Sequence, residues 1–201
     1  MSDYTDRLFD CVFNRWTPKI GDPSIMGWVT VGGYFAAAAI ALVVVLSADR
    51  FPEASRRREQ LFWTGVVLFM IVLGINKQLD LQSFFTATGR CISKFGGWYE
   101  DRQPVQATAV LILLTLCLLM GVFLLRLLRG VASRYMLALA GVVFIAAFIL
   151  VRAVGFTHVD ALINTRIAGW RMNWVLELGG ILLLAAGAIR ILALPRPRHE
   201  P

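Results

Sequence analysis

Long stretches without any charged residue are the feature that most restricts what this chain can fold into. Residues 23–48 and 103–125 contain no Asp, Glu, Lys, Arg or His. A helix of about 20 apolar residues spans the hydrocarbon core of a bilayer, so each stretch is long enough to cross it alone. The chain is 58% hydrophobic, whereas soluble domains have roughly 45–50% apolar residues. The sequence therefore predicts an integral membrane protein.

Three shorter apolar stretches, at 61–76, 135–151 and 178–189, are each bounded by a charged residue. Each reaches the length of a crossing only by taking a charge inward, which is tolerated when the charge pairs, snorkels or faces a bundle interior. We therefore predict an all-α fold, a single integral membrane domain over 1–201. Its five transmembrane helices are expected at about 25–47, 61–82, 104–126, 135–155 and 172–194.

The amino-terminal segment has the pattern of an amphipathic helix and lacks the apolar region of a cleavable signal peptide. Leu8, Phe9, Val12, Phe13 and Trp16 recur at helical spacing among charged residues. Such a helix lies in the membrane surface, and we expect it at about 3–16. The Pro- and Gly-containing residues that follow are expected to turn the chain into the first crossing.

Five alternating crossings divide the connections between two sides of the membrane. The first side receives the amino-terminal helix and the connections 82–102 and 157–171, and the second receives 49–60, 126–134 and the carboxyl-terminal tail. Lys and Arg divide equally, but on the second side they form short clusters, the arrangement that marks the cytoplasmic face. We therefore expect an outside amino terminus and an inside carboxyl terminus.

Two of the three cysteines, Cys11 and Cys91, fall on the first side. If that side is periplasmic, oxidation is permitted, and a disulfide could tie the surface helix to the 82–102 connection. Two buried free thiols are the alternative, because the sequence gives no distance between the Cα atoms. Cys117, in the middle of a crossing, is expected in the core. The chain has no metal-ligand spacing such as CxxC, so we expect no metal and no cofactor.

Polar residues gather where four predicted helices end on the first side, whereas the charges of the second side lie outside the helices. The second helix ends with Asn76, Lys77 and Asp80 on one face and Gln82 in a neighbouring row. The remaining members of this polar layer are Glu100, Arg102, Arg152, His158, Asp160, Arg171, Asn173 and Glu177.

The polar layer has three interpretations. It is an ion-pair network in which Glu177 pairs with Arg152 or Lys77 and fixes the order of the helices, or in which Lys77 and Asp80 simply neutralise each other. Alternatively, it is a pocket for an anionic lipid-like or small polar substrate. A proton or ion pathway is disfavoured, because nothing ionisable lies near the bilayer centre.

In the pocket interpretation, cationic and amide side chains hold the substrate while an acid or a histidine transfers protons. The candidate acid–base residues are Asp80, His158 and Glu177. The candidate binding residues are Asn76, Lys77, Gln82, Arg102, Arg152, Asp160, Arg171 and Asn173.

Two classes of function remain open. The chain binds, and in the stronger form processes, a lipid or small anionic ligand, or it is a non-catalytic subunit that holds a larger membrane complex together. Its expected partners are the lipid bilayer and such a ligand or a membrane protein. Nucleic acid is not expected, because no basic stripe occupies a soluble domain.

Four sequence blocks carry a resemblance: INKQLDLQ at 75–82, GWYE at 97–100, HVD at 158–160 and NWVLE at 173–177. They resemble those of a group of small, uncharacterised bacterial inner-membrane proteins, over nearly the whole chain. The resemblance implies the bacterial inner membrane, so the amino terminus is expected in the periplasm and the carboxyl terminus in the cytoplasm. It implies no activity and no catalytic residue.

Overall fold

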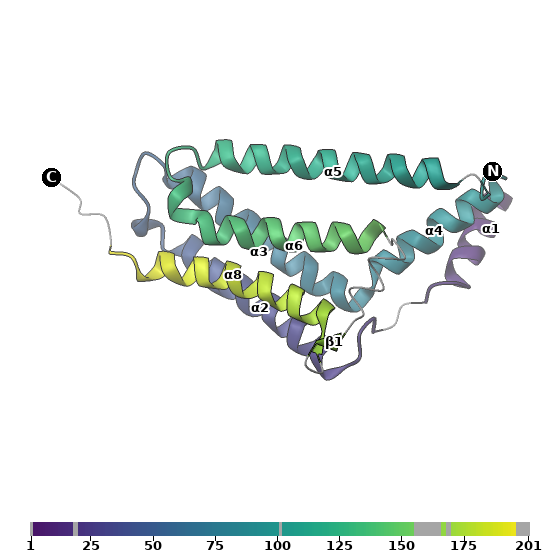
Figure 1. Ribbon diagram of the computed structural model, residues 1–201, viewed down its shortest axis with the longest axis horizontal. Coiled ribbons are helices and arrows are strands. Elements are labelled where there is room, and N and C mark those ends of the chain that lie inside the picture. Colours follow the sequence, from purple (N-terminus) through teal and green to yellow (C-terminus); the bar gives the residue numbers. More distant parts are fainter. Residues whose placement is uncertain (1, 18–19, 101, 155–165, 168–169, 196–201) are drawn as a thin grey trace.

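The protein is helical almost throughout. The computed structural model describes residues 2–17, 20–100, 102–154, 166–167 and 170–195, and Figure 1 shows their arrangement. The helices are α1 (Ser2–Phe13), α2 (Ile25–Leu46), α3 (Arg56–Leu79), α4 (Leu81–Phe95), α5 (Arg102–Leu127), α6 (Met136–Val154) and α8 (Met172–Ala193). Short 3₁₀ turns at Ala48–Arg50 (η1) and Ala132–Tyr135 (η2) precede α3 and α6, and the two-residue strands β1 (Arg166–Ile167) and β2 (Trp170–Arg171) form an antiparallel pair before α8.

Four helical segments are long and apolar enough to cross a membrane: α2, α3, Ala132–Leu150 and α8. The predicted helical class is therefore confirmed, and four of the five predicted crossings have helices of the required length and apolarity. Within α5, the apolar stretch among the described residues is the shorter Leu111–Leu127. The chain thus has the architecture of a multi-pass membrane protein.

Close helix contacts come from small residues. α2 packs against α3 and α8, and α6 packs against α8. A Cβ atom added at Gly187 on α8 would lie 2.6 Å from the backbone nitrogen of Ala138 on α6, and one added at Gly141 would lie 2.7 Å from the backbone nitrogen of Leu184. Small residues let helix backbones approach closely in lipid, where packing rather than the hydrophobic effect holds helices together.

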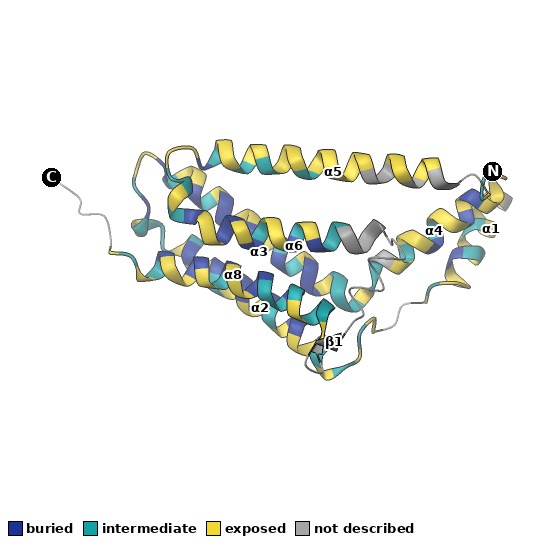
Figure 2. Ribbon diagram, viewed as in Figure 1, coloured by how far each residue is buried: buried dark blue, intermediate teal, exposed yellow. Residues whose placement is uncertain are grey.

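Large apolar side chains face outward along the bundle. Leu68 on α3, Leu118 on α5 and Leu182 on α8 are each more than half exposed, and Figure 2 shows that α5 is exposed along most of its length. An apolar surface of this extent is unusual for a soluble monomer, but it is the expected surface of helices that contact lipid. The interior is formed by tightly packed residues such as Tyr34, Trp63 and Met70.

The second long helix ends earlier than the sequence predicts. α3 ends at Leu79, Asp80 adopts a left-handed conformation with φ of 48°, and α4 begins at Leu81. The short polar side chain of an aspartate tolerates this conformation better than most residues do. Gln82 therefore belongs to α4, and most of the segment predicted as a connection is helical.

α4 is amphipathic and packs against α1. Its inward residues Ala87 and Cys91 are one helical turn apart and buried. Of the two alternatives for the first-side cysteines, the structure has the Cys11–Cys91 disulfide, with 6.1 Å between the Cα atoms.

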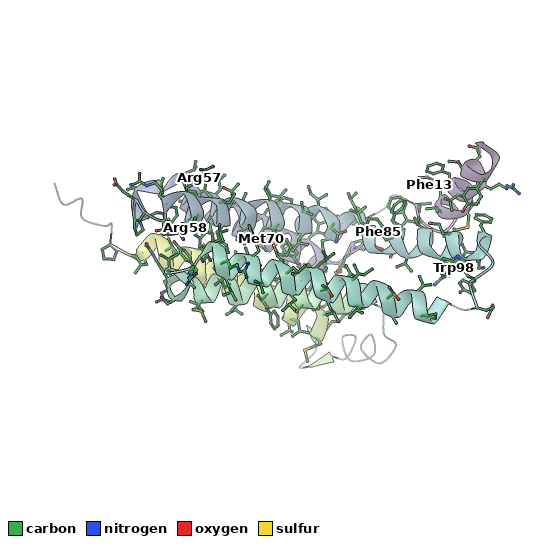
Figure 3. The ribbon with its side chains drawn as sticks, turned by 90° about the horizontal axis from the view of Figure 1, so that it is seen from above. Phe13, Arg57, Arg58, Met70, Phe85 and Trp98 are labelled. Atoms are coloured by element: carbon green, nitrogen blue, oxygen red, sulfur yellow. A yellow bond between two sulfur atoms is a disulfide. The ribbon has the colours of Figure 1, made fainter. Side chains whose placement is uncertain are left out.

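Figure 3 shows Phe13, Phe85 and Trp98 toward the end of the molecule that carries α1 and α4, and Arg57 and Arg58 at the opposite end. Cys117 is a free thiol that is half-buried on α5 rather than part of the core.

Candidate functional site

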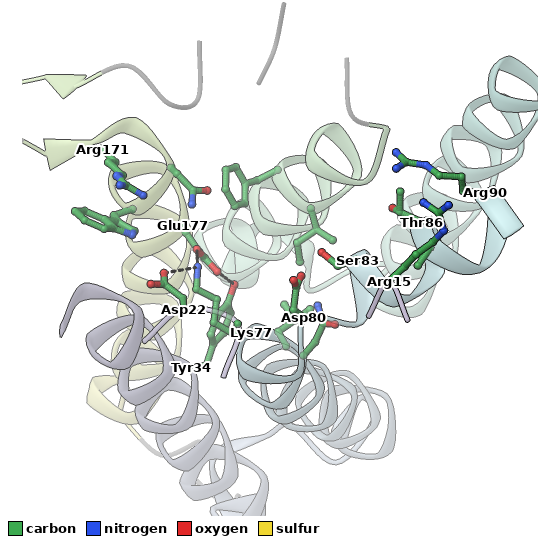
Figure 4. A pocket seen from close by; sticks show the side chains of 18 residues that line it. Arg15, Asp22, Tyr34, Lys77, Asp80, Ser83, Thr86, Arg90, Arg171 and Glu177 are labelled. Carbon is green, nitrogen blue, oxygen red and sulfur yellow. Dashed lines mark hydrogen bonds and ion pairs between the residues drawn. The ribbon is translucent and has the colours of Figure 1, made fainter. Parts of the chain in front are cut away.

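A polar cavity of about 540 Å³ lies at the end of the bundle that carries α1 and α4. Its walls come from the segment before α2, the end of α3, the start of α4, α6 and the start of α8, and Figure 4 shows its side chains. The structure brings together six of the residues predicted from sequence to form a site: Asn76, Lys77, Asp80, Arg171, Asn173 and Glu177.

An ion pair between two buried side chains closes the floor of the cavity. Lys77 Nζ on α3 lies 2.6 Å from Glu177 Oε2 on α8, and their side chains are 7% and 4% exposed. The Tyr34 hydroxyl on α2 donates a hydrogen bond to Glu177 Oε1 over 2.9 Å. Both carboxylate oxygens of Glu177 are therefore occupied, and one residue joins three helices. Of the sequence-based alternatives for Lys77, the structure has the pair with Glu177.

Asp22 lies in the loop before α2, outside the membrane-spanning segments. Its Oδ1 accepts a hydrogen bond of 2.6 Å from the Ser24 hydroxyl, and its Oδ2 lies 3.9 Å from Lys77 Nζ. Partial burial acts to raise the pKa of Asp22, but the hydrogen bonds from Ser24 and the charge of Lys77 outweigh it and lower the pKa below its ordinary value. Asp22 is thus held as a carboxylate beside the cavity.

Three arginines line the cavity from three separate segments. Arg15 follows α1, Arg90 lies on α4, and Arg171 is the last residue of β2. Among the described residues, no carboxylate forms an ion pair with any of them. The Arg171 guanidinium lies 5.3 Å from the centre of the Trp174 ring, a cation–π distance. The cavity therefore combines a neutralised floor with cations that have no acidic partner in the described part of the chain.

Two further polar groups face the cavity without an ion-pair partner. Asp80 lines it, and its carboxylate forms no ion pair or hydrogen bond with another described residue. Asn173 also lines it, and its buried Oδ1 accepts no hydrogen bond from the described residues. A buried polar atom without a partner is uncommon in a folded protein and calls for a ligand or water.

Five predicted site residues are not placed by these observations. His158 and Asp160 lie outside the described residues. For Gln82, Arg102 and Arg152 the backbone is described, in α4, α5 and α6 respectively, but their side chains lie outside the described part.

Several cavity residues were missed in the sequence analysis. Tyr34 lies in a charge-free run that looks uniformly apolar, although a tyrosine inside a crossing usually needs a hydrogen-bond partner. Arg90 lies in the segment that was predicted as a connection, and Arg15 reaches the cavity because α1 packs against α4. Thr86 and Ser83 belong to the segment that was predicted as a connection.

A second buried acid lies at the other end of the bundle, where the sequence analysis placed the charges outside the helices. This prediction was wrong for Glu59, which is buried in the first turns of α3. Its carboxylate accepts hydrogen bonds from the hydroxyls of Ser55 and Tyr135. Nearby, Arg134 donates to the Arg50 carbonyl over 3.1 Å. These contacts join the loop between α2 and α3 to the turn before α6.

The fold and the cavity define a class: a helical, multi-pass membrane protein with a polar, cation-rich cavity at one end of its bundle. Comparisons with protein-family models, with curated proteins and with solved structures found no match to this chain. Chemically, the arrangement favours binding. Each oxygen of the Glu177 carboxylate has a partner, whereas Arg15, Arg90, Arg171 and Asp80 have no ion-pair partner, and Asn173 Oδ1 no hydrogen-bond donor, in the described part of the chain.

Proposed function

We propose that this chain is a five-span protein of the bacterial inner membrane whose cavity opens toward the periplasm and binds an anionic lipid-like or small polar molecule. The fifth crossing is α5. The α5–α6 turn lies beside the loop between α2 and α3, because Tyr135 contacts Glu59 and Arg134 contacts Arg50. α5 begins near α4 at the cavity end (Figure 1), so it runs the length of the bundle.

The orientation is supported from both ends. Arg56, Arg57 and Arg58 cluster at the end opposite the cavity, and clustered cations mark the cytoplasmic side. The cavity end carries the Cys11–Cys91 disulfide, and disulfides persist in the periplasm rather than in the cytosol. The two signals agree. In this orientation α1 lies at the periplasmic surface of the inner membrane.

The binding proposal rests on one observation. Lys77 is neutralised by Glu177, whereas Arg15, Arg90 and Arg171 line the same cavity without an acidic partner among the described residues. A guanidinium presents several donors in a plane that matches the oxygens of a carboxylate or phosphate. The volume of about 540 Å³ falls in the range of small-molecule sites.

Two details refine the kind of ligand. Asn173 Oδ1, which has no hydrogen-bond donor among the described residues, would accept a hydrogen bond from a hydroxyl, so the ligand carries a polar group besides its anionic one. The α6 wall contributes Phe148 and Ile149, which suit an apolar portion. Among the described residues, Asp80 is the candidate for an acid–base step, since Glu177 is held by Lys77 and Tyr34 and Asp22 by Ser24.

A second candidate function is that of a non-catalytic subunit of a larger membrane complex. It is favoured by α5, whose main contacts among the described residues are limited ones with α3 and α6 and which exposes apolar residues such as Leu111, Leu118 and Phe123. A partner helix could cover this surface, although lipid would cover it equally well.

Native mass spectrometry of protein extracted mildly from membranes tests the proposal. The wild-type chain should carry a bound anionic molecule, and Arg171→Gln should lose most of it. Arg57→Gln is the matched control, because it removes the same charge from an exposed arginine at the opposite end. A wild-type chain that carries no ligand and instead retains a stoichiometric protein partner would overturn the binding function and support the subunit.

A further inference from the structure

The disulfide and two of the cavity arginines are neighbours in the chain. Arg15 lies four residues after Cys11, and Arg90 directly precedes Cys91. At the end of α1 the backbone nitrogens of Arg15 and Trp16 both donate to the Val12 carbonyl, over 3.0 and 2.8 Å. Arg15 is therefore fixed to the last turn of α1, and the position of α1 decides where its guanidinium lies.

The apolar packing of α1 on the rest of the described chain is limited. Among the described residues α1 packs mainly on α4. The Trp16 and Phe84 rings lie 5.0 Å apart, the Tyr4 and Phe95 rings lie 6.0 Å apart, and Val12 is the buried apolar residue of α1. A single short helix with one buried apolar residue has little packing energy to offset its loss of conformational freedom. The covalent link supplies the missing constraint.

The two arginines point to one region of the cavity. Figure 4 shows the side chains of Arg15 and Arg90 directed toward the same space beside Thr86, on the opposite wall from Lys77 and Glu177. Two guanidinium groups in one cavity repel each other, and no carboxylate of the described residues pairs with either. An anion with several oxygens removes this repulsion and accepts hydrogen bonds from both groups.

We propose that the Cys11–Cys91 disulfide holds Arg15 beside Arg90 of α4, so that the two arginines form a clamp for the phosphate group of the ligand and the cavity binds with full affinity only when the disulfide is formed. This inference rests on the proposed binding function and adds its ligand class and its dependence on oxidation. The shared chemistry is a phosphate ester or free phosphate. A lipid headgroup and a soluble phosphate compound both supply it.

Reduction of the disulfide would release the clamp. Dithiothreitol donates two electrons and two protons, which convert the Cys11–Cys91 bond into two thiols while the reagent closes into its own cyclic disulfide. α1 is then held by non-covalent contacts without the covalent link, and Arg15 is held less firmly beside Arg90. Cys117 is already a free thiol and is unchanged by this treatment.

The test is equilibrium binding by the purified full chain of two probes: phosphatidylglycerol in phosphatidylcholine nanodiscs, and inorganic phosphate in solution. If phosphatidylglycerol binds and inorganic phosphate does not displace it, the ligand is a lipid. If inorganic phosphate displaces phosphatidylglycerol, a soluble phosphate is sufficient for binding. Oxidised wild-type protein should bind at least one probe. Arg15→Gln and Arg90→Gln should each weaken binding roughly tenfold, the effect of losing one charge-assisted hydrogen bond. Arg57→Gln should leave it unchanged.

The disulfide is tested by non-additivity. Dithiothreitol, or the Cys11→Ser/Cys91→Ser variant, should weaken binding about as much as Arg15→Gln does, and Arg15→Gln should then have little further effect. Dithiothreitol acts on protein that is already folded, so this arm holds even where the serine variant does not fold. If reduction only lowered the overall stability of the protein, it would weaken binding equally in wild type and in every variant, Arg15→Gln included.

The outcomes separate the two proposals. If reduction leaves affinity unchanged while Arg15→Gln and Arg90→Gln weaken it, the binding function stands and the positioning role of the disulfide is wrong. If Arg171→Gln weakens binding and neither clamp variant does, the function stands and the clamp is wrong. If oxidised wild-type protein binds neither probe, the phosphate clamp is wrong, and the binding function fails only if native mass spectrometry also finds no bound molecule.

Discussion

Lys77 on α3 and Glu177 on α8 form an ion pair with 2.6 Å between Nζ and Oε2, although 100 residues separate them in sequence. Tyr34 on α2 donates to the second carboxylate oxygen, so three helices meet at one buried group. A desolvated ion pair adds less to stability than its Coulomb energy implies, but losing one partner leaves an uncompensated buried charge. The pair therefore acts mainly to fix how the three helices are arranged at the cavity floor.

Glu177→Gln should destabilise the protein by about 3–5 kcal/mol, because Lys77 is left buried without its partner. Lys77→Met should have a similar cost, and Lys77→Met/Glu177→Gln should cost clearly less than the sum. Thermal unfolding in detergent measures all three. Asp6→Asn, at an exposed carboxylate on α1, is the control and should change stability by less than about 0.5 kcal/mol. Strictly additive losses would show that the two residues do not act as a pair.

Gly187→Ala should push α6 and α8 apart, because the added Cβ would lie 2.6 Å from the backbone of Ala138. The expected cost is about 1–3 kcal/mol, the usual range for overpacking. Gly179→Ala on the same helix is the matched control, since a Cβ there meets nothing within 4 Å. Chemical or thermal unfolding in detergent compares the two. Equal effects would contradict the close crossing of α6 and α8.

Asp22 should make stability depend on pH in the acid range. Its pKa is lowered in the folded protein, since the hydrogen bonds from Ser24 and the charge of Lys77 outweigh partial burial. The stabilisation is therefore fully present above the unfolded value of about 3.9 and is lost as the pH falls through the folded pKa. The stability difference between wild type and Asp22→Asn should be largest near neutral pH and vanish in acid. A difference that grows toward acid would show that the pKa is raised.

The proposed orientation makes a prediction about reporters. Alkaline phosphatase, which is active only outside the cytoplasm, should be inactive when fused after Pro201 and active when inserted at Gly97, in the turn between α4 and α5. This follows from five crossings with the arginine clusters inside. Activity after Pro201 and inactivity at Gly97 would mean that the protein has the opposite orientation in the membrane. Activity at both positions would mean an even number of crossings between them, so α5 would not span.

Charges at the ends of apolar stretches explain why much of the floor of the cavity could be predicted. Lys77 and Glu177 interrupt runs that are otherwise too short to cross, so the sequence itself indicates that they are drawn inward. The position of Asp80 was predicted, but the break there was not, because a left-handed residue between two helices leaves little trace in hydropathy.

Residues contributed by distant contacts could not be predicted in this way. Tyr34 bonds to a residue 143 positions away, and nothing in its own apolar run indicates that partner. Arg15 comes to the cavity through the packing of α1 on α4 and the Cys11–Cys91 disulfide, which the sequence left as one of two alternatives. Apart from α3, which begins and ends earlier than predicted, the boundaries of the long helices were close because bilayer thickness sets helix length. The predicted list of site residues was incomplete because tertiary contacts decide which residues line the cavity.

An experimental density map of the oxidised protein in lipid nanodiscs tests the central claim most directly. The account predicts density that is not part of the chain inside the cavity, in contact with Arg90 or Arg171 and with the Lys77–Glu177 pair intact beneath it. A cavity closed by its own side chains, with those arginines paired to Asp80 or another acid of the chain, would contradict it.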